Sequence, residues 1–137
     1  MLNDFATLNS QVESNSGLYA DYWSQAYIDG LAKAEELREL LANVTLQYEF
    51  DGGLSRALKM VAQLMVIAEE RGKNRDAFFV RYGGFDHHSQ LMTNLEPKFE
   101  DLSTALSVFH QEMVFQGLAD KYTLVMTSEF ARVSTAI

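Results

Sequence analysis

The sequence predicts a helix-rich α/β fold, with one right-handed strand–helix–strand (βαβ) unit of two parallel strands behind two or three N-terminal helices. Two observations support this prediction. Apolar residues recur at helical spacing over much of the chain, and two short aromatic and β-branched runs, at 77–82 and 122–127, flank the clearest helical pattern. The 137 residues suit one domain, with a loose lead-in at 1–16, a helical part at 17–72 and the βαβ unit at 76–132.

The first helices are expected from the spacing of aromatic and aliphatic residues. Three aromatic residues lie three, four and eight positions after Tyr19, which predicts one core-facing helix face. They are Tyr22, Trp23 and Tyr27. A second helix is expected from about residue 54, with two apolar rows that indicate a buried helix and with Gly72 at its C-terminal end.

The clearest element is a helix between the two predicted strands. Its apolar residues alternate four and three apart, and Pro97 is expected in its first turn and Gly117 at its end. These apolar residues are Leu95, Phe99, Leu102, Leu106, Phe109 and Met113. A strand, a helix and a parallel strand form a right-handed crossover, so the loops that follow both strands should leave from the same sheet edge. Ligands bind at that edge in open α/β sheets.

Composition and charge exclude several classes of function. The net charge of −8 gives no electrostatic basis for binding nucleic acid or an anionic membrane surface. The absence of cysteine excludes disulfides, thiolate metal sites and a cysteine nucleophile. Residues 1–16 have no signal-peptide pattern, and no apolar run is long enough to span a bilayer. The compartment is left open.

The two loops at the predicted sheet edge carry the candidate site. Glycines in the first loop permit a sharp turn and a close approach to a ligand. Carboxylates and imidazoles of this kind suit zinc, manganese or iron. The first loop offers Gly83, Gly84, Asp86, His87 and His88, and the second offers Ser128, Glu129 and Arg132.

An alternative interpretation of these loops is purely structural. Asp86 would then cap a turn, both histidines would be solvated, and Glu129 would pair with Arg132, and the pattern alone does not separate the two interpretations. Ser128 has no general base beside it in the sequence and no Gly-x-Ser-x-Gly context, which disfavours a serine nucleophile. His110 is expected on the surface of the long helix.

Several segments in order resemble a large bacterial family, the domain of unknown function 1501. The most specific of these segments are the Gly-Gly-Phe-Asp-x-His-x-x-Gln motif at 83–90 and the Ser-Glu-Phe-x-Arg motif at 128–132. The others are 57–64, 78–82, 102–106 and 117–120. That family looks like a branch of the alkaline-phosphatase-like superfamily, which includes phosphatases, sulfatases and phosphoglycerate mutases.

The resemblance implies roles for individual residues. Asp86, His88 and Glu129 match positions that would hold a divalent metal, zinc or manganese, and Arg132 would lie near an anionic substrate. The family usually has Thr where His87 stands, so His87 is either an extra ligand or irrelevant. It also has Gly and Thr where this chain has Ala131 and Val133, so the chain departs from the family pattern directly after Glu129.

The resemblance also implies a longer protein than 137 residues. Family members carry an N-terminal half, often behind an export signal, and a later Asp-His-Gly-type motif. This chain is therefore expected to be fragment-like, with a partial or vestigial metal site and no hydrolase activity of its own. The alternative is a non-catalytic α/β module that forms homo-oligomers, because a two-stranded sheet exposes its edges.

Overall fold

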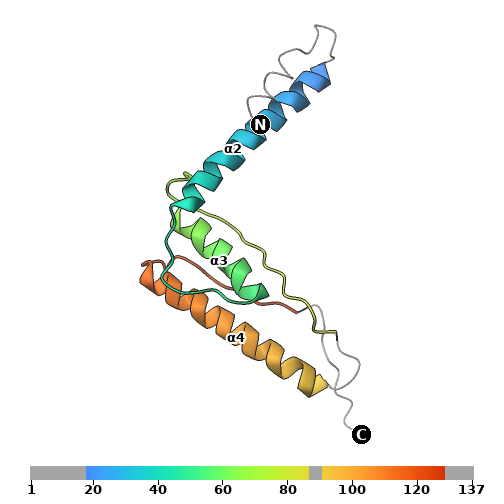
Figure 1. Ribbon diagram of the computed structural model, residues 1–137, viewed down its shortest axis with the longest axis vertical. Helices are drawn as coiled ribbons and strands as arrows, with labels where there is room; N and C mark the ends of the chain where they lie inside the picture. The colour runs from blue at the N-terminus through green and yellow to red at the C-terminus, as the bar shows by residue number, and fades with distance from the viewer. Residues whose placement is uncertain (1–17, 87–90, 129–137) are drawn as a thin grey trace.

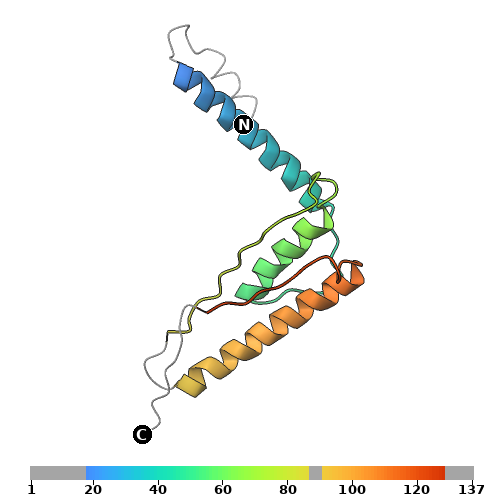
Figure 2. The same cartoon turned by 180° about the vertical axis from the view of Figure 1, so that it is seen from behind.

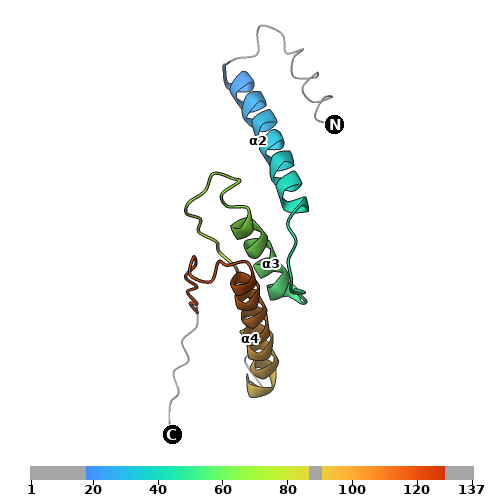
Figure 3. The same ribbon diagram turned by 90° about the vertical axis from the view of Figure 1, so that its left-hand side faces the viewer.

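Three α-helices form the regular structure of the computed structural model, which describes residues 18–86 and 91–128 (Figure 1). Helix α2 covers Leu18–Ala42, α3 covers Gly53–Val66 and α4 covers Leu91–Phe115. Helices α3 and α4 pack against each other, whereas α2 extends away from both (Figures 1 and 3). Helical periodicity thus predicted these three elements, but α3 ends at Val66 rather than near Gly72. No helix in the described part of the chain is long and apolar enough to cross a membrane.

The prediction of an α/β fold with a βαβ unit was wrong, because residues 18–86 and 91–128 contain no strand. The stretches 75–86 and 122–128 run as extended chain in one direction, opposite to α4 (Figures 1 and 2). Val80, Tyr82 and Tyr122 pack against the core between α3 and α4. The aromatic and β-branched pattern therefore identified extended backbone but not a strand partner, since the helices cover these side chains instead.

The core lies between α3 and α4. On α3, Leu54, Leu58 and Ala62 are four residues apart and are buried on one face, as the sequence predicts for a buried helix. They form one cluster with Phe50, Ala105, Phe109 and Met113. Each fully buried large apolar side chain contributes about 1.5–3 kcal/mol relative to an exposed one, so the α3–α4 pair is the main stabilised unit.

A buried carboxylate ties the segment between α2 and α3 to α4. Glu112 is 0% exposed, and its Oε2 accepts the backbone N–H groups of Gln47 at 2.9 Å and Tyr48 at 2.8 Å. Its Oε1 accepts a hydrogen bond from Nε2 of Gln116 at 2.7 Å, and the same Nε2 donates to the carbonyl of Thr45 at 3.2 Å. These bonds replace the water that a buried carboxylate would otherwise need.

Helix α4 ends as the sequence predicts but begins earlier. Gly117 has a φ of 71°, and the N–H groups of Gly117 and Leu118 bond to the carbonyls of Val114 at 3.1 Å and Met113 at 2.8 Å. This is a Schellman motif, which satisfies two carbonyls at the helix end. Pro97 lies inside α4 rather than in its first turn, because the helix already starts at residue 91.

The aromatic face of α2 is exposed, which contradicts the prediction that it faces the core. Tyr19 is 81% exposed, Tyr22 69% and Trp23 71%, and Tyr27 is also more than half exposed at 52%. Helical spacing correctly placed these rings on one face. It could not show that α2 would extend beyond the α3–α4 pair, where neither α3 nor α4 packs along it (Figure 3).

Candidate functional site

The segment that leads to the predicted metal loop is fixed on α4 through Tyr82. Its ring packs against the core between α3 and α4, and its hydroxyl donates a hydrogen bond to Oδ2 of Asp101 at 2.5 Å. Partial burial, followed by this hydrogen bond and the negative charge of Asp101, raises the pKa of Tyr82 to about 12. At neutral pH the phenol is therefore a stable hydrogen-bond donor to the carboxylate.

Lys98 fixes the next two residues of the segment. Its Nζ donates to the carbonyl oxygen of Gly83 at 3.0 Å and lies 4.7 Å from the centre of the Tyr82 ring. This is a cation–π distance, and it places a positive charge directly beside the start of the loop. Gly84 has a φ of 85°, and a Cβ at this position would lie only 2.7 Å from Nζ of Lys98.

Aromatic contacts continue the same attachment up to Phe85. Its ring makes an edge contact with Tyr82, with 5.4 Å between centroids, and a tilted contact with Phe99 at 6.0 Å. Asp86 follows directly and is exposed. The candidate ligand Asp86 thus comes immediately after a segment that is held on α4 by hydrogen-bond, cation–π and ring contacts.

The second predicted loop follows an extended segment that is held at its other end. Tyr122 contacts the ring of Phe109 edge-on at 5.3 Å, and its hydroxyl lies 2.7 Å from Nδ1 of His110. His110 is exposed on α4, as predicted from the sequence. The chain then runs beside α3 and α4 to Ser128, which is also exposed (Figure 2).

Only part of the predicted site lies within the described residues. Asp86 and Ser128 end two segments that run in the same direction, toward the end of the molecule where α4 begins (Figures 1 and 2). His87, His88, Glu129 and Arg132 lie outside the described ranges 18–86 and 91–128. Within those ranges, no three acidic or histidine side chains gather in a group that could hold a metal.

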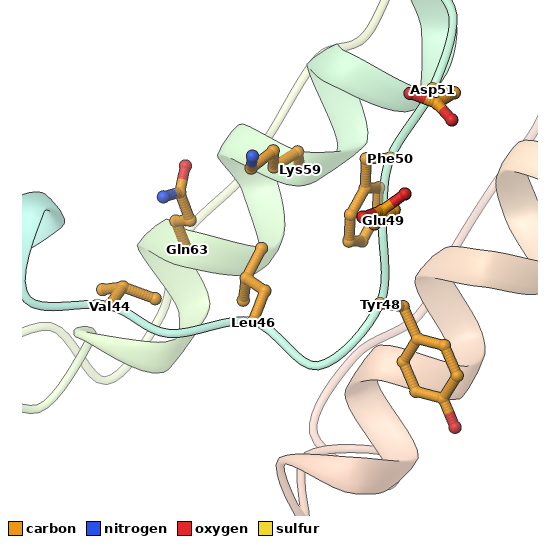
Figure 4. A pocket seen from close by; sticks show the side chains of 8 residues that line it. All are labelled: Val44, Leu46, Tyr48, Glu49, Phe50, Asp51, Lys59 and Gln63. Carbon is orange, nitrogen blue, oxygen red and sulfur yellow. The ribbon is translucent and has the colours of Figure 1, made fainter.

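An open pocket lies elsewhere, between the segment 44–51 and α3 (Figure 4). Lys59 and Gln63 reach it from α3, and the acidic residues Glu49 and Asp51 reach it from the connecting segment. The remaining lining residues are Val44, Leu46, Tyr48 and Phe50. This pocket contains no candidate ligand from either predicted loop, and its surface is open to solvent.

Sequence reasoning missed Lys98 and Asp101, the two residues that hold the first loop. They are three apart and therefore lie on one face of α4, in the same row as the buried Ala105. That row was a usable signal, because polar residues in line with a small buried residue lie at the edge of a packed face. The predicted apolar stripe drew attention to Leu95 and Phe99 instead.

The described part of the protein is thus a pair of packed helices, α3 and α4, that carries two extended segments, each leading to one of the predicted loops. Residues 30–136 match a family described as protein of unknown function, DUF1501. The match covers most of the chain and includes both loops, so the chain belongs to the DUF1501 family. The search of curated proteins and the search of solved structures found no match.

Proposed function

We propose that this chain supplies part of a divalent-metal site in an alkaline-phosphatase-like hydrolase of phosphate or sulfate esters. Asp86, His88 and Glu129 are the proposed ligands for zinc or manganese, and Arg132 is the proposed contact for the anionic ester. The assignment rests on the resemblance of the two motifs, in this order, to the alkaline-phosphatase-like superfamily, and both motifs lie within the part of the chain that matches the DUF1501 family. His87 and Ser128 are further groups that the same site would have within reach.

The attachment of the first loop is the observation that carries this proposal. Three kinds of contact hold the chain just before Asp86, and the Nζ of Lys98 bonds to Gly83 at 3.0 Å. A metal ligand loses affinity when its backbone must first be ordered, so an anchored loop is the arrangement that a metal site needs.

The proposed chemistry follows from the ligand types. A carboxylate and an imidazole bind zinc or manganese, and a metal held by them would polarise the ester and activate a nucleophile. Two-metal sites of this kind take more ligands than Asp86, His88 and Glu129 can provide. We therefore expect the 137-residue chain to bind metal but not to hydrolyse aryl phosphates or aryl sulfates at a measurable rate.

Calorimetric titration with zinc and with manganese tests the proposal. Asp86→Ala should raise the dissociation constant at least about tenfold, which corresponds to about 1.4 kcal/mol. Asp120→Ala is the matched control, because Asp120 is an exposed carboxylate that pairs with Lys121 at 3.2 Å, away from both loops. Equal affinity in all three proteins, or no binding to the unaltered chain, would contradict the proposal.

The second candidate function is a non-catalytic module that forms homo-oligomers. It is favoured by exposed apolar side chains on the two extended segments, where Phe79 is 91% exposed and Val125 77%. Exposed apolar groups of this size favour association with another surface. Light scattering on the intact chain should then give a dimer or a larger species, whereas a monomer at all concentrations would eliminate this candidate.

A further inference from the structure

The 25-residue helix α2 presents an exposed apolar stripe that no described helix covers. Tyr19 and Trp23 are four residues apart and are 81% and 71% exposed, and Tyr22, at 69%, borders them. At about 100° per residue, the stripe continues through Ala26 and Gly30 toward the C-terminal half of the helix. In proteins, a helix gains most of its stability from packing of such a face against another surface. We therefore expect a partner to cover this stripe.

The stripe is complementary to itself when two copies of α2 run antiparallel. With Gly30 facing Gly30 of the second copy, position 23 meets position 37 and position 19 meets position 41. Trp23 then lies opposite Leu37, and Tyr19 lies opposite Leu41. A two-fold axis requires that, when one residue contacts a second residue in the other copy, the second residue also contacts the first. This register satisfies that condition.

The small residues at the centre of the stripe support the same register. Ala26 lies opposite Ala34, and a Cβ added at Gly30 would meet nothing within 4 Å, so two backbones can approach closely at the axis. Arg38 lies at the border of the stripe, where its guanidinium pairs with Glu35 of the same helix at 2.6 Å and so leaves the centre of the stripe apolar.

Charge disfavours a membrane as the partner, and the area of the stripe suits a small interface with a second copy. The acidic residues Asp21, Glu35 and Glu39 lie on the opposite face of α2, and with the net charge of −8 they disfavour an anionic membrane surface. Enclosed aromatic side chains bury on the order of 150–250 Å² each. Six such rings across two copies approach the roughly 1,200 Å² that small specific interfaces bury.

We propose that α2 is a homodimer surface, on which two chains pair antiparallel through the stripe of Tyr19, Trp23, Ala26, Gly30 and Leu37. This proposal rests on the oligomeric candidate function, for which it names the surface. It is independent of the metal site.

Light scattering and sedimentation of the full chain test the surface with two matched variants. Ala26→Glu places a charge in the stripe, and Ala32→Glu places the same charge on the opposite face of the same helix, where Ala32 is exposed. The unaltered chain and Ala32→Glu should be dimers. Ala26→Glu should raise the dissociation constant at least about tenfold, because a charge buried between apolar faces is costly.

Disulfide trapping tests the register and does not depend on any loss of stability. The chain has no cysteine, so Gly30→Cys introduces one thiol that lies next to its own copy on the two-fold axis. Oxidation should convert most of Gly30→Cys to a covalent dimer and leave Ala32→Cys monomeric on a denaturing gel. Equal trapping of both variants would overturn the antiparallel register.

A dimer formed through α2 and a dimer formed through the extended segments respond to different substitutions. If the unaltered chain is a dimer that Phe79→Asp disrupts and Ala26→Glu does not, the chain self-associates through its extended segments and the α2 surface is rejected. If the unaltered chain is a monomer, both proposals are rejected.

Discussion

The hydroxyl of Tyr82 lies 2.5 Å from Oδ2 of Asp101, and this bond joins the segment before the predicted metal loop to helix α4. The other carboxylate oxygen, Oδ1, lies 3.4 Å from the place where Gly52 would carry a Cβ. Asp101 therefore sits where α4, the N-terminal end of α3 and the segment 75–86 come together. A substitution of Tyr82 should therefore lower the stability of the α3–α4 pair as well as loosen the attachment of the loop.

Tyr82→Phe should lower the free energy of unfolding by about 1–2 kcal/mol, because a hydrogen bond to a charged, partly buried acceptor is lost. Urea denaturation followed by circular dichroism measures this change. Tyr48→Phe is the control, since Tyr48 is 38% exposed and its loss of a hydroxyl should change stability by less than about 0.5 kcal/mol. Equal effects of the two substitutions would show that the bond to Asp101 contributes nothing.

The raised pKa of Tyr82 predicts a loss of stability at high pH. The folded chain holds this phenolic proton up to about pH 12, whereas an unfolded tyrosine releases it near pH 10. The contribution is thus complete below about pH 10 and disappears as the pH rises through about 12. The stability difference between the unaltered chain and Tyr82→Phe should shrink across that window, and a difference that stays constant would contradict the assignment.

Gly84→Ala should destabilise the chain, whereas Gly83→Ala should be close to neutral. Gly84 has a φ of 85°, and an added Cβ would lie 2.7 Å from Nζ of Lys98, while Gly83 has nothing within 4 Å. A left-handed backbone costs a residue with a Cβ about 1–2 kcal/mol. Thermal unfolding of both variants measures the difference, and equal midpoints would show that Gly84 does not keep this conformation.

How far the sequence predicts the fold depends on which physical effect each pattern reports. Helical spacing identified α2, α3 and α4 because 3.6-residue periodicity is a local property. It failed on the environment of α2, where Trp23 is exposed, because a helical face says nothing about what lies opposite it. The aromatic and β-branched pattern failed on the predicted strands, where Tyr82 and Tyr122 pack against helices.

The buried face of α4 shows a further limit. Phe99 belongs to the predicted apolar stripe but is 55% exposed, while Ala105 and Glu112 are almost completely buried. A small residue and an acid carry little weight in an apolar pattern. The burial of Glu112 depends on N–H groups from a segment more than sixty residues away, which no local pattern can reveal.

The candidate site was predicted from two motifs, and the structure adds how the first one is held. Asp86 follows the contacts of Tyr82 and Phe85, none of which the loop pattern itself predicts. His88 and Glu129 lie outside the described residues, so their convergence on Asp86 stays a prediction. Convergence of distant side chains depends on the whole chain path, whereas residue types at short spacing only propose the chemistry.

Glu112 gives the last prediction, because its carboxylate satisfies two backbone N–H groups at once. Glu112→Ala should cost about 2–4 kcal/mol, since Gln47 and Tyr48 would each keep a donor without its acceptor. Glu112→Gln should cost only about 1 kcal/mol, because the amide oxygen can accept both N–H groups while the Gln116 amide turns to accept from the new NH2 group.

Urea denaturation and amide hydrogen exchange check this ranking. The exchange of the Gln47 and Tyr48 amides should accelerate strongly in Glu112→Ala and little in Glu112→Gln. Gln111→Ala is the control on the neighbouring position, which is exposed and should change stability by less than about 0.5 kcal/mol. If Glu112→Gln proves as damaging as Glu112→Ala, the negative charge itself stabilises this segment, and the geometry of acceptance is not sufficient.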